Sequence, residues 1–332
     1  MTEVRPLLRD ELLPPGRPPR RHLISIDDLT REDVERLLAL ARTFSRSLER
    51  EVKKLPTLRG YTVVNLFYES STRTSSSFEL AAKRLSADVM SIKATGSAVD
   101  KGESLKDTAL TIGAYDPDVV VIRHPQIGAP NLVTRYTKAH VVNAGDGKHQ
   151  HPTQALLDLY TIDAEFSAIA GLHVAIVGDV LHSRVARSNI QAMRLMGATV
   201  TVVGPPPLIP RGIEAMGCRV SYDIDAIKAA DVVYVLRMQR ERMLEGANYV
   251  PSLREYTARW GVTADRLRPG QKVMHPGPMN RGVEIDAEVA DAADALIERQ
   301  VRSGLVVRMA VLYDLVTHGP VEVKVVEMAE VA

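Results

Sequence analysis

Residues 62–85 read TVVNLFYESSTRTSSSFELAAKRL, and this stretch contains the repeating unit of the fold. The apolar run at 62–68 is of strand type, whereas 78–85 is helical in composition and spacing. Between them, hydroxyl side chains are grouped around Arg73. A helix N-terminus has free N–H donors and a partial positive charge, so this junction favours an anion site. A capped helix start without a ligand stays open as the alternative interpretation.

The same alternation continues along the chain. Further strand-type runs occur at 88–92, 118–124, 140–144, 173–179, 199–204, 231–237 and 272–276. Helical stretches lie at 104–112, 153–162 and 183–195, and an earlier helix is expected to begin at Thr30 with Asp33 completing a capping box. Short strands that alternate with helices are typical of βαβ units. We therefore expect an α/β fold with two doubly wound parallel sheets.

This pattern predicts two domains and two flanking segments. Residues 1–21 are expected to form a disordered or loosely attached arm, and 22–151 the first domain. The second, Rossmann-like domain is expected over 152–302. A last helix at 303–318 is expected to pack back onto the first domain.

Composition excludes several classes of protein. The 332 residues carry a formal net charge of +1, which offers no global field for nucleic acid or a membrane surface. The single cysteine, Cys218, excludes an internal disulfide and is expected to be buried. No apolar run approaches the ~18 residues of a membrane span, and the first residues lack the apolar core of a signal peptide. We expect a cytoplasmic protein.

Arginine ends or follows four of the strand-type runs, at positions 73, 123, 184 and 237. Ligands of open α/β sheets bind at the carboxyl ends of strands. Four planar guanidinium groups there would suit a ligand with several carboxylate or phosphate groups. A solvated surface charge is the alternative for each of them. No P-loop motif occurs, and GDVLHS at 178–183 has too few glycines for a dinucleotide fingerprint, so neither signature is present.

Three more segments contain groups suited to a binding site. In HQHPTQ, His151 and Gln154 share one face of a first helical turn and are both expected to donate to a carbonyl oxygen. Arg237 and Gln239 lie on the same side of an extended segment. HPGP at 275–278 predicts a tight turn whose backbone carbonyls can accept from an NH₂ group. A structural histidine, a metal-binding His149–His151 pair and a simple rigid loop are the competing interpretations of these segments.

Taken together, SSTRT, the loop SAVDKGES at 97–104, HPTQ, RMQRER and HPGP occur in the order found in one family. The chain resembles the aspartate carbamoyltransferase catalytic chains over residues 22–318. The resemblance implies transfer of the carbamoyl group of carbamoyl phosphate to L-aspartate, a step of pyrimidine synthesis, without a cofactor or a metal. It also implies a homotrimer with active sites at subunit interfaces, and possible further assembly with regulatory chains or a dihydroorotase.

The resemblance also assigns residues to the three parts of a site. The phosphate group would contact Ser71, Thr72, Arg73 and Thr74. The carbamoyl group would contact Arg123, His151, Gln154, Gly277 and Pro278. Aspartate would contact Lys101, Arg184, Arg237 and Gln239, with Ser97 and Lys101 coming from a neighbouring subunit. Catalysis would depend on Arg73, Thr74, Lys101, Arg123 and His151, with His151 as a donor to the developing oxyanion rather than a base.

The chain departs from the family pattern at two places. Position 75 is serine where the family often has arginine, and HPGP stands where some members have HPLP. Ornithine carbamoyltransferases share STRT but use an SMG-type loop and an HCLP cysteine, which RMQRER and HPGP replace here. Two arginines suit a dicarboxylate better than a cationic side chain. Another amino-acid carbamoyltransferase, a Rossmann oxidoreductase and a non-catalytic scaffold are the rival functions.

Overall fold

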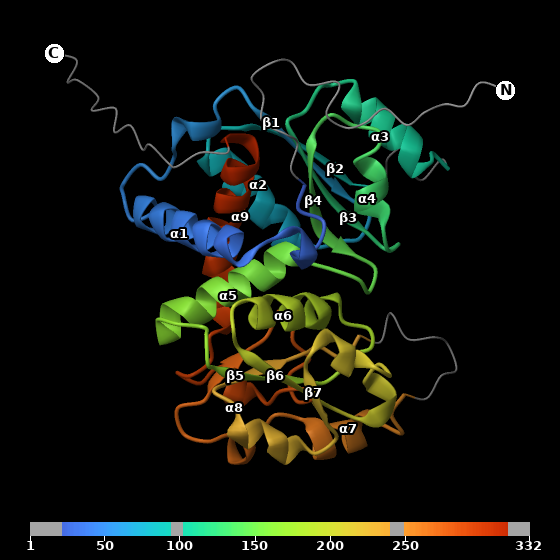
Figure 1. The fold of residues 1–332 in the computed structure, drawn as a ribbon, viewed down its shortest axis with the longest axis vertical. Coiled ribbons are helices and arrows are strands. Elements are labelled where there is room, and N and C mark those ends of the chain that lie inside the picture. Colours follow the sequence, from blue (N-terminus) through green and yellow to red (C-terminus); the bar gives the residue numbers. More distant parts are fainter. Residues whose placement is uncertain (1–21, 94–101, 240–248, 318–332) are drawn as a thin grey trace.

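The computed structural model describes residues 22–93, 102–239 and 249–317. Its strands form two sheets, one in the upper and one in the lower half of Figure 1, and every strand pairing within them is parallel. Helices flank both sheets. The predicted fold class, two doubly wound parallel sheets, is confirmed.

The first sheet has four strands in the order β2-β1-β3-β4. Its strands are β1 (Thr62–Phe67), β2 (Asp88–Lys93), β3 (Val119–His124) and β4 (His140–Asp146). The helices that follow the first three strands are α2 (Thr72–Arg84), α3 (Leu105–Gly113) and α4 (Ala129–Val133). Each predicted strand of this half is present.

The second sheet has five strands in the order β7-β6-β5-β8-β9. Its strands are β5 (His173–Val177), β6 (Thr199–Val203), β7 (Arg219–Ser221), β8 (Val232–Val235) and β9 (Lys272–Met274). Helix α5 (Pro152–Phe166) leads into this half, which also contains α6 (Arg184–Leu195), α7 (Leu253–Trp260) and α8 (Ala287–Ala290). The edge strand β7 was not predicted, because three partly exposed residues give no periodic signal. Cys218, just before it, is buried as expected.

One hydrophobic core is shared by the two sheets. Successive strand residues face opposite sides, so Val63 joins this central core while Val64 joins a separate cluster on the outer face of the first sheet. In β5, Ile176 joins the central core and Val177 a cluster on the other face of the second sheet. Near-continuous apolar strands follow from burial on both faces. The central core therefore fixes one sheet against the other.

Two long helices close this core. Helix α1 (Arg31–Ser47) begins at the predicted capping box, in which Thr30 and Asp33 exchange hydrogen bonds. Helix α9 (Ile297–Thr317) packs against α1, α2 and α5, and it begins six residues before the predicted helix at 303. The division of the chain at 151–152 and 302–303 stays a prediction. None of the described helices is both long and apolar enough to span a bilayer.

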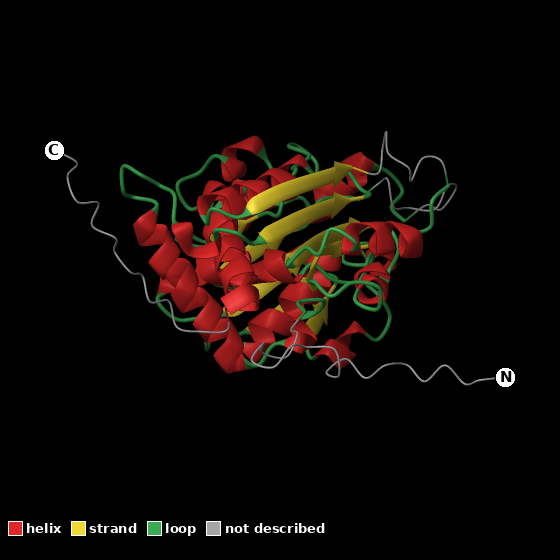
Figure 2. Cartoon of the chain, turned by 90° about the horizontal axis from the view of Figure 1, so that it is seen from above, coloured by secondary structure: helices red, strands yellow, loops and turns green. Residues whose placement is uncertain are grey.

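The strand order gives each sheet one switch point, at β1 in the first sheet and at β5 in the second. In the first sheet the next strand, β2, lies on one side of β1 and the following strand, β3, lies on its other side. In the second sheet β6 and β8 flank β5 in the same way. Such switch points open a crevice between the carboxyl ends of adjacent strands. Strand arrowheads point to a common side in Figure 2. The segments that follow β1, β3, β5 and β8 therefore gather where a ligand is expected.

Candidate active site

The N-terminus of α2 forms the first part of the candidate site. Ser71 occupies the N-cap position, but its side chain makes no capping hydrogen bond. Thr74 is buried, whereas Thr72 and Arg73 are exposed. The first-turn N–H groups of α2 are thus not occupied by a serine hydroxyl. They retain the donors and the partial positive charge that suit a phosphate.

Arg73 joins this helix to the turn after β9. Its Nη1 atom donates to the carbonyl oxygen of Pro276 at 2.6 Å. Gly277 has a φ of +61°, and a Cβ added there would lie 1.7 Å from the same Nη1 atom. The positive φ therefore favours glycine at 277, and an added Cβ would also displace the guanidinium of Arg73. The predicted HPGP turn lies against the predicted anion cradle.

Glu69 lies between two of the predicted arginines. Its Oε2 atom accepts hydrogen bonds from Arg123 Nε at 3.2 Å and from Arg184 Nη2 at 2.5 Å. Arg123 comes from β3 and Arg184 from the start of α6, so the carboxylate connects the two sheets. Glu69 was not predicted as a site residue from the sequence. The available signal was an acidic side chain placed between a strand end and a cluster of positive charge.

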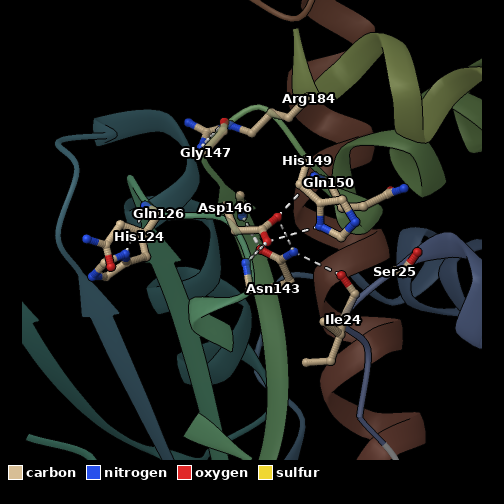
Figure 3. A network of polar contacts seen from close by, with 12 residues as sticks. Ile24, Ser25, His124, Gln126, Asn143, Asp146, Gly147, His149, Gln150 and Arg184 are labelled. Atoms are coloured by element: carbon tan, nitrogen blue, oxygen red, sulfur yellow. Dashed lines mark hydrogen bonds and ion pairs between the residues drawn. The ribbon is translucent and has the colours of Figure 1, made fainter. Parts of the chain in front are cut away.

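The loop 145–151 is held in shape by Asp146, as Figure 3 shows. Oδ1 accepts from Asn143 Nδ2 at 2.9 Å and from the backbone N–H of Gln150 at 3.0 Å. Oδ2 contacts His149 Nδ1 at 3.1 Å. Burial opposes ionisation of Asp146, but hydrogen bonds from His149, the backbone N–H of Gly128 and Asn143 outweigh it and lower the pKa of the carboxyl group. The hydrogen bond to Asp146 raises the pKa of His149.

Arg184 packs against this loop from the second sheet. It is only 3% exposed, and its Nη1 atom donates to the carbonyl oxygen of Gly147 at 3.2 Å, a contact also visible in Figure 3. A Cβ at Gly145, whose φ is +117°, would lie 2.9 Å from Arg184 Nε. The glycine thus leaves room for the guanidinium. Arg184 is a fixed group between the sheets rather than a solvated surface charge.

His151 and Gln154 are both buried at the start of α5, as the N-cap residue and in the first turn. The backbone N–H of His151 donates to Ser188 Oγ of α6 at 2.8 Å. Gln154 Nε2 donates to Asp158 Oδ1 at 3.1 Å. This contact uses one of the two N–H groups of the Gln154 amide and turns its nitrogen toward Asp158. This geometry differs from the expected one for Gln154.

Arg237 and Gln239 follow β8 and are both half-buried, whereas Met238 between them is buried. This agrees with the prediction that they share one side of an extended segment. Asp179 holds this segment, because its Oδ2 atom accepts the backbone N–H of Gln239 at 3.1 Å. Burial, and the positive charges of Arg73 and Arg237, lower the pKa of His275. The charge of Arg237 thus acts on the histidine that begins the 275–278 turn.

Most predicted residues are brought together at the strand ends, while Ser97 and Lys101 lie outside the described residues. Among the residues with described positions, no group of three histidine, cysteine or acidic side chains is arranged to hold a metal. The site is thus a set of guanidinium groups, helix N-termini and amide groups between two sheets. It is suited to holding a ligand with separated anionic groups.

Two family models match nearly the whole described chain. They are the carbamoyl-P binding domain of aspartate/ornithine carbamoyltransferases, over residues 21–164, and their Asp/Orn binding domain, over 170–315. The aspartate carbamoyltransferase catalytic subunit of Acidothermus cellulolyticus is 56% identical over 303 residues, covering 90% of this chain and 93% of its own. That of Salinispora arenicola is 57% identical, covering 88% and 97%.

Solved structures agree with these sequence matches. Aspartate transcarbamoylase from Trypanosoma cruzi, in complex with carbamoyl phosphate and aspartate, superposes with a TM-score of 0.80 at 31% identity, covering 88% of this chain and 96% of its own. The catalytic subunit of M. jannaschii aspartate transcarbamoylase gives a TM-score of 0.79 at 36% identity, covering 90% and 100%.

Proposed function

Because this chain belongs to the aspartate/ornithine carbamoyltransferase family, we propose that it transfers the carbamoyl group of carbamoyl phosphate to the amine of L-aspartate. The products are N-carbamoyl-L-aspartate and phosphate, and the reaction belongs to pyrimidine synthesis. One observation carries the proposal. Arg123 of the first half and Arg184 of the second meet on Glu69 beside the end of β1, in a chain more than half identical to aspartate carbamoyltransferase catalytic subunits.

The phosphate group would bind at the N-terminus of α2. The backbone N–H groups and hydroxyls of 71–74 surround this position, and no serine side chain caps the helix. The guanidinium of Arg73 already donates to the carbonyl oxygen of Pro276, in the turn after β9 of the second sheet. It would bind the phosphate from that position. Unoccupied N–H donors at a helix start stabilise an anion through hydrogen bonds and the helix dipole.

The carbamoyl group would lie between α5 and the 275–278 turn. Thr74, Arg123 and His151 are proposed to donate to its oxygen. The oxygen of Gln154 and the backbone carbonyls of Gly277 and Pro278 are proposed to accept from its NH₂ group. Donors on one side and acceptors on the other distinguish the two ends of the carbamoyl group.

The chemistry requires no covalent enzyme intermediate. The neutral amine of aspartate attacks the carbamoyl carbon, and the oxygen gains negative charge in a tetrahedral species. The bond between the carbamoyl carbon and the phosphate oxygen then breaks. Phosphate leaves with the electron pair of this bond and accepts the proton that the amine releases. Each donor to such an oxyanion is worth roughly 10²–10³ in rate. Fixing both substrates in line supplies a further part of the acceleration.

The two carboxylates of aspartate would bind Arg184, Arg237 and Gln239. Arg184 is already fixed between the sheets, and Arg237 follows β8 on the segment where Asp179 binds the backbone N–H of Gln239. The family also contains ornithine carbamoyltransferases, whose substrate carries a cationic side chain. Two guanidinium groups at this end of the crevice favour a dicarboxylate.

The finer features of assembly are proposals as well. Ser97 and Lys101 are proposed to enter the site of a neighbouring subunit in a homotrimer, and we expect that trimer in the cytoplasm. Support comes from the resemblance of the SAVDKGES loop and from the catalytic-subunit relatives. Assembly with regulatory chains or a dihydroorotase stays an expectation of the resemblance alone.

An acceptor assay tests the proposed reaction. Purified chain is mixed with carbamoyl phosphate and either L-aspartate or L-ornithine, and both carbamoylated products are quantified. We expect N-carbamoyl-L-aspartate and no citrulline, and we expect Arg73→Ala to lose several orders of magnitude of turnover. Citrulline as the main product, or no product from a well-folded chain, would contradict the proposal.

A further inference from the structure

A fully buried carboxylate lies behind the candidate site. Asp158 is on α5, one helical turn after Gln154, and is 0% exposed. Four side chains donate to it, two to each oxygen. They are Gln154 and Gln300 on Oδ1, at 3.1 and 2.7 Å, and Asn189 and Tyr234 on Oδ2, at 2.9 and 2.7 Å. Four donors match the accepting capacity of an ionised carboxylate.

Burial of this charge is costly. Desolvation raises the pKa of Asp158 to about 6, although the hydrogen bonds from Asn189, Tyr234 and Gln300 act against that rise. Arg308 of α9 is the nearby buried cation, and burial lowers its pKa to about 10. Well-packed apolar residues often replace a buried ionic group without loss of stability. A purely structural role is therefore a weak explanation for Asp158.

Oδ1 determines the orientation of Gln154. An ionised carboxylate only accepts hydrogen bonds, so the amide of Gln154 must turn its NH₂ group toward Asp158. Its carbonyl oxygen is then directed elsewhere. The orientation of the Gln154 amide group thus depends on the negative charge of Asp158.

The same oxygen reaches the 275–278 turn through Gln300. The Nε2 atom of Gln300 donates to Asp158, and its Oε1 atom accepts the backbone N–H of His275 at 2.9 Å. His275 Nδ1 in turn accepts the backbone N–H of Gly277 at 2.8 Å. One carboxylate oxygen therefore supports both groups that are proposed to accept from the carbamoyl NH₂.

We propose that Asp158 is a positioning residue that makes the site select a carbamoyl phosphate over an acyl phosphate that lacks the NH₂ group. This inference rests on the proposed function. With Asp158 in place, the oxygen of Gln154 and the backbone carbonyls of Gly277 and Pro278 would be held toward the NH₂ group of the bound carbamoyl phosphate. Acetyl phosphate would leave these acceptors unsatisfied, and a site built to hydrogen-bond a polar group rejects an analogue without it.

Binding measurements on the intact chain test this role. Calorimetry with carbamoyl phosphate, acetyl phosphate and inorganic phosphate is compared for wild type and Asp158→Leu. We expect carbamoyl phosphate to bind roughly 10- to 100-fold more weakly to the variant, because its acceptors are misplaced. The other two ligands should bind almost as before, since the α2 cradle is untouched. Equal weakening of all three ligands would show a structural role and overturn the inference.

Three further variants make the result specific. Asp158→Asn keeps one oxygen that Gln154 and Gln300 can share, so most of the preference should return. Gln300→Leu breaks only the link to the turn and should reduce the preference even if Asp158→Leu does not fold. Asn189→Ala removes a donor from Oδ2 alone and should keep the wild-type preference. A loss of preference in Asn189→Ala, or none in Gln300→Leu, would contradict the inference.

Turnover separates this inference from the proposed function. Wild type must form N-carbamoyl-L-aspartate, and its failure to do so would overturn the reaction itself. If wild type is active and Asp158→Leu keeps its preference for carbamoyl over acetyl phosphate, only the role of Asp158 is overturned.

Discussion

At the residue scale, single side chains here hold groups from both sheets in contact. Glu69 binds Arg123 and Arg184, and Arg73 donates to the turn after β9. The Glu69–Arg184 and Arg73–Pro276 contacts join the two halves of the chain, whereas the Glu69–Arg123 contact lies within the first half. Their geometry, rather than the presence of four arginines, supports the proposed site for two anionic substrates. Two substitutions test this role of the contacts.

Glu69→Gln should lower turnover by at least about tenfold and raise the KM for aspartate. The neutral amide no longer balances two guanidinium groups, so Arg123 and Arg184 repel each other and lose their fixed positions, and small misplacements are costly in catalysis. Steady-state kinetics with both substrates measures the effect. Unchanged kcat and KM would show that Glu69 does not orient these arginines.

Gly277→Ala should abolish most activity, whereas Gly282→Ala should not. Both glycines have positive φ, +61° and +77°, so each alanine costs about 1–2 kcal/mol of unfolding free energy. Only at 277 would the new Cβ collide with Arg73, since Gly282 has nothing within 4 Å. Denaturant unfolding and turnover are measured for both variants. Equal activity in the two would contradict the proposed contact between Arg73 and the turn.

At the element scale, the loop 145–151 depends on the ion pair of Asp146 with His149. The pKa of Asp146 is lowered, so its contribution to stability is present above the ordinary carboxyl value and is lost as pH falls through the folded value. The pKa of His149 is raised, so its contribution is complete below about 6.5 and is lost as pH rises through the folded value. The pair is strongest between these limits.

His149→Ala should therefore reduce stability most near pH 5 to 6, by less than about 1 kcal/mol, because the imidazole is partly exposed and screened. Above pH 8 the variant and wild type should unfold at almost the same denaturant concentration. Urea titrations at several pH values give this difference directly. A larger gap at high pH than at low pH would show that the charge on His149 does not stabilise the loop.

At the scale of the whole molecule, the strands and their ends were predictable, and the contacts between the sheets were not. Val- and Ile-rich apolar runs such as 62–68 and 173–179 predicted strands, and these runs are nearly continuous because both faces of each strand are buried. The arginines were visible because they follow those strands. Asp158 and Gln300 are 142 positions apart, and no local pattern indicates that they meet. The same is true of Glu69 with Arg184, at a separation of 115 positions.

The proposed shared sites predict complementation between inactive chains. Lys101→Ala and His151→Ala chains should each be nearly inactive alone, because each lacks one half of every site. Mixed under conditions that exchange subunits, they should recover part of the activity, since a hybrid trimer contains an intact site. Native mass spectrometry verifies exchange. Proven hybrids without recovered activity would argue for self-contained sites.

One crevice between the two sheets is proposed to bind both substrates. A crystal structure with a bisubstrate analogue, a phosphonate joined to an aspartate, tests this most directly. We predict the phosphonate at the N-terminus of α2 beside Arg73, and the two carboxylates on Arg184 and Arg237. An analogue bound away from the strand ends, or with its carboxylates at the start of α2, would contradict the proposed site.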